Sequence, residues 1–408
     1  CLHCHFVLWA TVMKESAKAA LSWVRAGAGE TGLARFVPWP QLDAHDIAVG
    51  NPEGLGQADM ISARHLRLRL RVLPLFDRRL SFGTVVIEGL DAGLVVDRQG
   101  RNNWTFAPRR DDGGVPWTVQ IQRLLVRHAR VTLADAAHEL DLEGSATSLD
   151  DPPYGLALAV RGRYRGERFT GQGRAGSLLE LAEATQAFPI DFALDSASVH
   201  LAASGHLIRA TPPAEFDVKL ALSMGNLAAV YPLTGIALPA TPAVRTSGRL
   251  IGRRDQGIGR YTYENFSATI GRSDLAGTVS FALTRPRPRL TGAVHSKGWR
   301  LADLGPSVGA GSARARAGAG TERVLPSEPF RVERLDAMDA EVQASAGQLA
   351  AAADIAAEAL ETTIKLEAGL LTLDPLALRL AGGKVSASIV FDRRGSEPKA
   401  RLRASLDR

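Results

Sequence analysis

The sequence predicts a mainly β protein, and two observations lead to that prediction. Apolar residues alternate with polar ones at a period of two along many short segments, which is the pattern of a half-buried strand. These segments recur at roughly 8–12-residue spacing between turns rich in Gly, Pro and Asp, as in all-β proteins. No segment between them is typical of the crossover helices that join parallel strands, so we expect an antiparallel sheet.

The clearest strand covers residues 66–72, where aliphatic side chains alternate with arginines. One face would carry Leu66, Leu68, Leu70 and Val72, and the other Arg67, Arg69 and Arg71. A second apolar face of this kind follows at Phe216, Val218, Leu220 and Leu222. The arginines are most simply a solvated outer face. Alternation does not reveal what covers the apolar face, so a closed β-sandwich core and an exposed apolar surface both remain open.

A few segments depart from the strand pattern. Residues 14–25 have apolar side chains at helical spacing, and residues 177–187 form a second helical candidate. Residues 305–320 are a low-complexity Gly/Ala run and are predicted to be a linker. Residues 338–361 are rich in Ala, whose propensity favours a helix, whereas residues 370–391 alternate like strands. We therefore expect a mixed tail in which strands dominate.

Composition limits the possible functions. The hydrophobic share of 45% and the charged share of 23% are those of a folded protein. A net charge of only +6 and an aromatic share of 6% argue against nucleic-acid binding, although a basic surplus suits an anionic membrane surface. Cys1 and Cys4 are the only cysteines. The apolar run at residues 6–13 is shorter than the ~20 residues that span a bilayer.

Two motifs resemble cofactor sites, and neither has the required context. Residues 1–5 match the C-x-x-C-H haem-attachment pattern but stand at the very start of the chain, without a surrounding haem domain. Residues 171–176 match G-x-G-x-x-G, yet a polar segment precedes them where a dinucleotide fold needs a buried strand. We interpret these glycines as structural turn residues. The histidines show no metal-ligand spacing, so we predict no enzyme activity, cofactor or metal.

Three ordered stretches resemble the AsmA family. The first runs from Ile47-Ala48-Val49-Gly50-Asn51-Pro52 to Asp97-Arg98-Gln99-Gly100-Arg101-Asn102-Asn103-Trp104 and includes the family's "D-r-x-G-x-x-N-W" ending. The second covers residues 273–305, and the third covers residues 335–383. Each motif is moderately specific by itself, and their shared order over residues 31–408 makes chance resemblance improbable.

The resemblance implies a long curved antiparallel sheet that forms an apolar trough, with a short amino-terminal helix. We expect a remnant membrane anchor and short helix at 1–30, a β-groove region at 31–305, a linker at 306–326, and a truncated carboxy-terminal module at 327–408. The eight aliphatic and aromatic residues named above, from Leu66 to Leu222, would line the groove.

The resemblance also implies a non-enzymatic protein of the Gram-negative periplasm, anchored to the inner membrane by a segment that is missing or truncated here. Its partners would be phospholipid acyl chains, the inner membrane and other envelope proteins, and not nucleic acid. It would handle or transport phospholipid in outer-membrane biogenesis. The alternative is an assembly factor or scaffold that helps outer-membrane proteins fold without carrying lipid.

Overall fold

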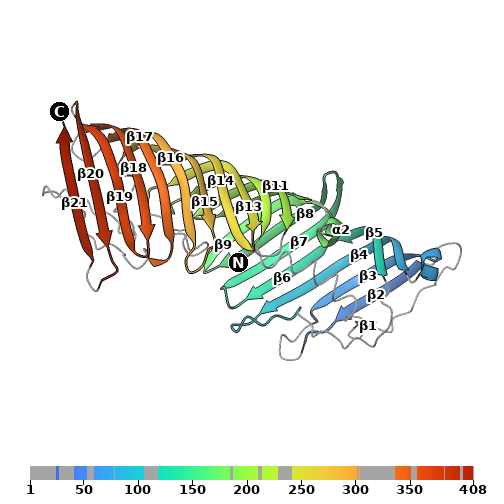
Figure 1. Ribbon diagram of the computed structural model, residues 1–408. Coiled ribbons are helices and arrows are strands. Elements are labelled where there is room, and N and C mark those ends of the chain that lie inside the picture. Colours follow the sequence, from blue (N-terminus) through green and yellow to red (C-terminus); the bar gives the residue numbers. More distant parts are fainter. Residues whose placement is uncertain are drawn as a thin grey trace. The chain divides into compact units, whose positions relative to one another are not determined.

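Strands dominate the protein in the computed structural model (Figure 1), as the alternation predicts. The structure describes residues 24–26, 41–52, 59–77, 79–104, 118–183, 187–209, 214–227, 241–300, 303, 336–350, 356–380, 382–395 and 398–407. Among these residues, no helix has the length and apolarity that crossing a bilayer requires. The predicted linker at 306–326 and the C-x-x-C-H motif lie outside the described residues.

Contacts divide the chain into two units. Unit 1 comprises Cys1–Ala197 and Ser204–Thr211, and unit 2 comprises Ser198–Ala203 and Pro212–Arg408. The strand β11 (Val199–Arg209) contributes residues to both units. Each unit is described by itself below.

Unit 1 is one twisted sheet with a single helix among its described residues. Its strands are β1 (Val24–Ala26), β2 (Gln41–Val49), β3 (Ile61–Arg71), β4 (Arg79–Val96), β5 (Thr118–Arg127), β6 (Ala129–Asp135), β7 (Leu140–Asp151), β8 (Tyr154–Tyr164), β9 (Glu167–Ala175) and β10 (Phe188–Ser196). A 3-10 turn, η1 (Leu73–Asp77), follows β3, and α2 (Leu178–Glu183) lies between β9 and β10.

Most neighbours in unit 1 are antiparallel, but the long strand β4 is an exception. Its first half pairs in parallel with β5 and its second half pairs in parallel with β6. His128 separates β5 from β6, and its φ of 54° lies in the left-handed region. From β6 the sheet continues through β7, β8 and β9 to β10, each pair antiparallel.

Unit 2 is a more regular sheet in which sequence neighbours are also spatial neighbours. Its strands are β12 (Glu215–Met224), β13 (Val244–Asp255), β14 (Ile258–Ile270), β15 (Ser273–Ala282), β16 (Arg289–Arg300), β17 (Asp339–Ala350), β18 (Ala356–Glu367), β19 (Leu370–Leu380), β20 (Gly383–Asp392) and β21 (Lys399–Asp407). The β16–β17 pair is parallel, and every other pair from β12 to β21 is antiparallel. The sheet is therefore largely antiparallel, as expected, with a few parallel joins.

The helix predictions have mixed outcomes. The helix predicted at 177–187 is confirmed over Leu178–Glu183 as α2, and residues 184–186 lie outside the described residues. The helix predicted at 14–25 is wrong at its end, because Val24 and Arg25 belong to β1, and the rest lies outside the described residues. The Ala-rich stretch 338–361 forms β17 and the start of β18. Pairing on both sides of β17 outweighs the helix propensity of alanine there.

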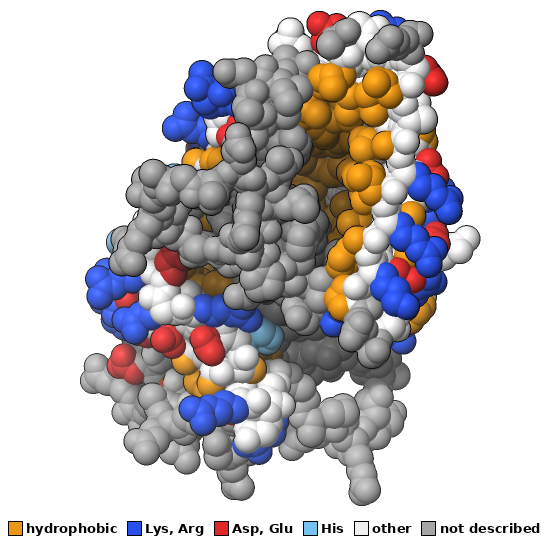
Figure 2. All heavy atoms as spheres, turned by 90° about the vertical axis from the view of Figure 1, so that its left-hand side faces the viewer, with side chains coloured by type: hydrophobic (Ala, Val, Ile, Leu, Met, Phe, Trp, Pro, Cys, Tyr) orange, Lys and Arg blue, Asp and Glu red, His pale blue; other side chains and the backbone are white. Residues whose placement is uncertain are grey.

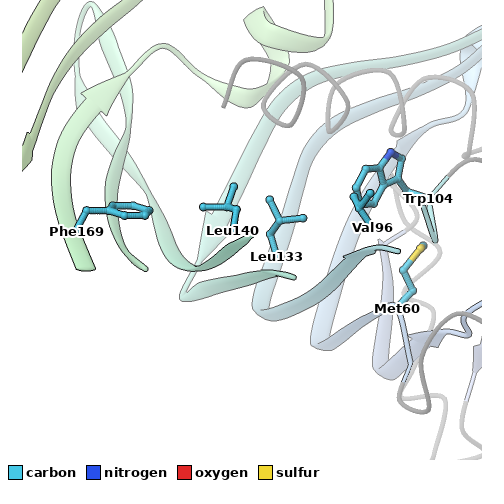
Figure 3. Packing of buried hydrophobic residues seen from close by; sticks show 6 residues of the cluster. All are labelled: Met60, Val96, Trp104, Leu133, Leu140 and Phe169. Carbon is cyan, nitrogen blue, oxygen red and sulfur yellow. The ribbon is translucent and has the colours of Figure 1, made fainter. Parts of the chain in front are cut away.

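The largest core cluster of unit 1 lies on one face of its sheet. Figure 3 shows its six buried side chains spread across the strands β4 to β9 and the adjoining segments: Met60, Val96, Trp104, Leu133, Leu140 and Phe169. Trp104 is only 6% exposed. Asn103 fixes the segment before it, because its side-chain amide accepts from Val95 N at 2.9 Å and donates to Asn51 Oδ1 at 2.7 Å. Trp104 thus acts as a packing anchor.

Candidate functional site: one apolar face on each unit

The register of unit 2 aligns apolar side chains across ten strands. One row contains Val218, Leu250, Tyr263, Val279, Gly292, Val342, Ile364, Leu373, Ile389 and Leu402. Residues that are paired across strands project to the same face of a sheet. At ~4.8 Å per strand, the nine steps of this row follow about 43 Å of sheet. We call this surface the apolar face of unit 2.

The neighbouring rows repeat the pattern. One contains Phe216, Tyr261, Phe281, Leu290, Leu366, Leu371 and Phe391, with Gly252 and alanines at the remaining places. Within it, the rings of Phe216 and Tyr261 stack with centroids 6.0 Å apart. The apolar face is therefore several residues wide as well as ten strands long.

Unit 1 has an equivalent surface. Leu42, Leu68, Val85 and Leu124 form one row across β2 to β5, and Leu94, Leu133, Leu142, Gly162 and Phe169 form another across β4 to β9. Leu124 packs against the buried cluster of Ala63, Leu90, Val126 and Ala129, and Ile61 contacts both this cluster and that of Trp104. The two rows therefore belong to one surface, the apolar face of unit 1.

Local bulges keep apolar side chains on these faces where the spacing is not two. Tyr263 and Phe266 are three residues apart, yet their rings stack with centroids 5.1 Å apart. The register shifts between them, and Asn265 has a φ of 47°. An extra residue of this kind bends a strand and resets its alternation. In unit 1, Gly89 has a φ of 64° and lies between Ile87 and Leu90, which pack in the same cluster. The register with β3 continues there without a shift, so the left-handed backbone alone changes the alternation.

The apolar face of unit 2 is not a closed core. Leu371, Leu373, Val385, Ile389 and Phe391 are half-buried. On β21, Leu402 is 68% exposed and Leu406 is 65% exposed. Figure 2, viewed from the side where β20 and β21 lie in Figure 1, shows hydrophobic side chains lining a hollow. A dry sandwich interior would bury such residues almost completely.

The opposite faces are charged and internally paired. In unit 1, the Arg161 Nη2–Glu143 Oε2 distance is 2.6 Å, and this hydrogen bond lowers the pKa of Glu143. In unit 2, Arg289 pairs with Glu341 at 2.8 Å, and Arg249 pairs with Asp217. Lys, Arg, Asp and Glu side chains mark the outer surface in Figure 2. Each unit thus has one face for water and one face for apolar groups.

The residues predicted to line a groove fall into two groups of four. On β3, Leu66, Leu68 and Leu70 are half-buried on the apolar face of unit 1, whereas Val72 lies just beyond the strand, 39% exposed. On β12, Phe216 and Val218 are buried, and Leu220 and Leu222 are half-buried on the apolar face of unit 2. That these side chains line a lipid groove stays a prediction.

The described residues contain no group of three or more His, Cys, Asp or Glu side chains arranged to hold a metal. Two pairs of a histidine and a carboxylate occur in the described part of unit 1. In the turn after β6, His138 Nδ1 is 2.8 Å from Asp135 Oδ2, whose side chain is buried. The second pair lies on the outer face. There, His65 Nε2 is 3.1 Å from Asp43 Oδ1, and His65 Nδ1 is 3.8 Å from Glu88 Oε2. The other side chains that bind Asp43 there, Gln41 at 2.7 Å and Arg67 at 2.9 Å, are not nucleophiles.

The G-x-G-x-x-G segment is structural, but it is not a turn. Gly171 and Gly173 lie inside β9, which is paired with both β8 and β10. A Cβ on Gly171 would come within 2.7 Å of Phe192 Cζ, and one on Gly173 within 2.4 Å of the Asp191 carbonyl oxygen. The glycines therefore admit a ring and a backbone that approach closely. The prediction that these glycines are structural is confirmed, but their predicted location in a turn is wrong.

Comparisons with known proteins address the family of the chain. The model of the AsmA family matches residues 25–174 and 153–408. The chain is similar to the AsmA family protein YhjG of Escherichia coli (strain K12), with 30% identity over 404 residues. That alignment covers 88% of this chain and 58% of the relative, so the chain spans little more than half of that protein's length. No solved structure matches the chain. The family match covers nearly all of the sequence, and the chain belongs to the AsmA family.

Proposed function

We propose that this chain is a non-enzymatic envelope protein that binds phospholipid acyl chains on its apolar faces and moves them between the inner and outer membranes. The observation that carries the proposal is the row from Val218 to Leu402. It carries an apolar or aromatic side chain in every strand except β16, where Gly292 stands, and it is half-exposed over β19 to β21.

The energetics of lipid in water favour such a surface. Exposing an acyl chain costs ~0.8 kcal/mol per CH₂, so about 30 groups amount to roughly 25 kcal/mol. A continuous apolar surface lowers that barrier without any covalent step. The row of about 43 Å is longer than the ~15 Å that one chain occupies in half of a bilayer's hydrocarbon core. One chain can therefore shift along the face while staying in apolar contact.

We also propose a periplasmic location and attachment to the inner membrane. Membership of the AsmA family supports an envelope protein. The net charge of +6 suits an anionic membrane surface. Fractionation of Gram-negative cells that express the full-length protein tests the location, with recovery in the inner-membrane fraction expected.

Lipid extraction tests the proposed activity. The chain, expressed with its native flanking sequence in the cell envelope, is purified in mild detergent, and its bound lipid is quantified by phosphorus assay and mass spectrometry. We expect phospholipid at a stoichiometry of at least one per chain. Lipid-free protein that instead copurifies with unfolded outer-membrane proteins would support the assembly-factor alternative and contradict the lipid proposal.

A further inference from the structure

The sheet of unit 1 contains a slot between β5 and β7. β5 pairs with β4 and ends just before β6 begins. β6 pairs with β7, from Ala129–Ala146 to Asp135–Leu140. In the other direction β5 and β7 diverge, and β7 keeps its pairing with β8. Among the described residues, the facing edges of β5 and β7 form no strand ladder with each other. A pocket of about 390 Å³ occupies the space between them.

The lining residues show that the pocket passes between the strands. On β5 it is lined by the consecutive residues 122–125, and on the β7–β8 hairpin by residues 148–155. Consecutive residues of a strand point to opposite faces. A pocket over the middle of one face would touch mainly every second residue, so this pocket lies at the strand edges.

Specific contacts hold the slot at both ends. At its base, Val126 N donates to Ser148 Oγ at 2.8 Å. At its outer rim, Arg123 Nη2 and Asp150 Oδ1 are 3.5 Å apart, with side chains 58% and 92% exposed. Between these contacts the half-buried Leu125 and Leu149 line the walls.

Helix α2 connects the slot to the apolar face of unit 1. A capping box fixes the start of the helix, since Glu180 N donates to Ser177 Oγ at 3.2 Å and Ser177 N donates to Glu180 Oε2 at 2.9 Å. Leu179 lines the pocket, and the adjacent Leu178 packs against the cluster that contains Val126. The slot therefore opens onto the surface to which we assign lipid.

We propose that this slot admits one acyl chain of a phospholipid onto the apolar face of unit 1, with the lipid phosphate beside Arg123 at the rim. The inference rests on the proposed lipid function and adds a location for loading. A volume of about 390 Å³ lies near the lower end of the ~300–1,000 Å³ range of ligand pockets, which suits one chain better than a whole phospholipid.

A peptide strand fits the slot less well. An added strand needs backbone partners along an edge, but Pro152, Pro153 and Pro189 on the walls have no N–H to donate. The contact between Val126 and Ser148 also limits how far an added strand could extend along the slot. An acyl chain needs an apolar path, and the leucines of the lining offer one: Leu124, Leu125, Leu149 and Leu179. The polar lining residues Gln122, Asp151 and Glu180 would then face the headgroup or water.

Bridging the slot tests the proposal. In the full chain with Cys1→Ser and Cys4→Ser, the substitutions Leu125→Cys and Leu149→Cys allow a short bis-maleimide to link the walls. The readout is uptake of phosphatidylglycerol with a fluorescent acyl chain, from vesicles of phosphatidylethanolamine and phosphatidylglycerol. The control pair Ser145→Cys and Ala159→Cys is bridged identically on the outer face, where the two residues are register partners.

We expect bridging of the slot to remove most of the initial uptake rate, with the control unaffected. An unchanged rate in the bridged slot, with normal final loading, would overturn the slot proposal and leave the lipid function intact. No uptake by any variant, bridged or not, would overturn both. Recovery of a peptide linked to either introduced thiol of the slot before bridging would assign the slot to a strand instead.

Arg123 is tested separately from the slot walls. Arg123→Gln should lower loading of phosphatidylglycerol by about fivefold, because a basic residue beside an anionic lipid contributes ~1 kcal/mol. It should not change loading of diacylglycerol, which has no phosphate, and Arg123→Lys should restore most of the loss. Arg161→Gln on the outer face is the charge-matched control. Equal losses for both lipids would contradict the role given to Arg123.

Discussion

The two units separate an apolar face from a charged one, but they use their apolar faces differently. In unit 1 much of the face packs against the protein itself, because Met60 and Trp104 are 2% and 6% exposed and α2 places Leu178 on it. In unit 2 the face over β19 to β21 is half-exposed. Alternation alone is therefore compatible with a self-packed face and with an open one. The segments that carry Met60 and Trp104, together with α2, make the difference in unit 1.

The sheet of unit 2 is also more regular than the sheet of unit 1. Unit 1 contains a strand paired in parallel with two others, a helix and a slot. Unit 2 follows chain order across ten strands. We therefore expect unit 2 to be the more extended binding surface, and unit 1 to be the more sensitive to loss of packing.

The largest expected effect is loss of lipid from unit 2. Replacing Leu373 and Ile389 together with lysine places two charges in the central row of the apolar face. Bound phospholipid, measured by phosphorus assay, should fall several-fold. The control variant carries Thr372→Lys and Ser388→Lys, which are the outward-facing neighbours on the same strands. Equal lipid loss in both variants would show that the face does not matter.

Removal of the packing anchor should affect unit 1 alone. Trp104→Ala should lower the free energy of unfolding of unit 1 by about 3–5 kcal/mol, because it empties a buried aromatic site. Hydrogen exchange should then accelerate in β2 to β9 and stay unchanged in β12 to β21. Trp299→Ala, 9% exposed in a cluster of unit 2, is the reciprocal variant. Loss of protection in both units from either change would contradict their independence.

The left-handed backbone at Gly89 predicts a smaller effect. Gly89→Ala should cost about 1–2 kcal/mol, since a residue with a Cβ is strained at a φ of 64° and the added Cβ would meet Arg64. Gly83→Ala in the same strand is the control, because no atom lies within 4 Å of its added Cβ. Chemical denaturation of the two variants measures the difference. Similar free energies of unfolding would show that the left-handed backbone at position 89 is not required.

The smallest effect should come from the outer face of unit 1. Hydrogen bonds from Gln41, then from Arg67 and His65, lower the pKa of Asp43 from 3.8 to about 2, against burial that raises it. A lowered pKa means that the ionised carboxylate stabilises the fold above pH ~4, and that this contribution disappears as the pH falls towards 2.

Asp43→Asn should therefore destabilise unit 1 by about 1 kcal/mol at neutral pH and have little effect near pH 2. Denaturation curves of the wild-type protein and the variant at several pH values provide the measurement. A difference that does not shrink below pH 4 would indicate that shape, and not charge, is what the substitution removes.

Much of the fold could be predicted from the sequence because period two is a strong signal. The Leu/Arg alternation located β3 and assigned Leu66 and Leu68 to one face. Val72 fits the same pattern but lies in the bend before η1. Pro74, two residues further on, cannot donate to a ladder, so the strand ends early.

Other features of the fold leave no period-two signal in the sequence. The spacing of Tyr263 and Phe266 contradicts period two, and only the left-handed backbone of Asn265 puts both rings on one face. The slot depends on the divergence of β5, which pairs with β4, from β7, which pairs with β6 and β8. Residues 118–127 and 140–151 look like ordinary strands in the sequence. Bulges and strand divergence are tertiary properties, so these parts of the candidate site required the structure.

Site-specific photocrosslinking along β12 tests the central claim most directly. A benzophenone amino acid is introduced singly at the consecutive positions Lys219, Leu220, Ala221 and Leu222, and crosslinked phospholipid is detected by mass spectrometry. Leu220 and Leu222 lie on the apolar face, and Lys219 and Ala221 lie on the other. Crosslinking with a period of two, at positions 220 and 222 only, is the predicted result. Equal crosslinking at all four positions, or none at any, would contradict a lipid-binding apolar face.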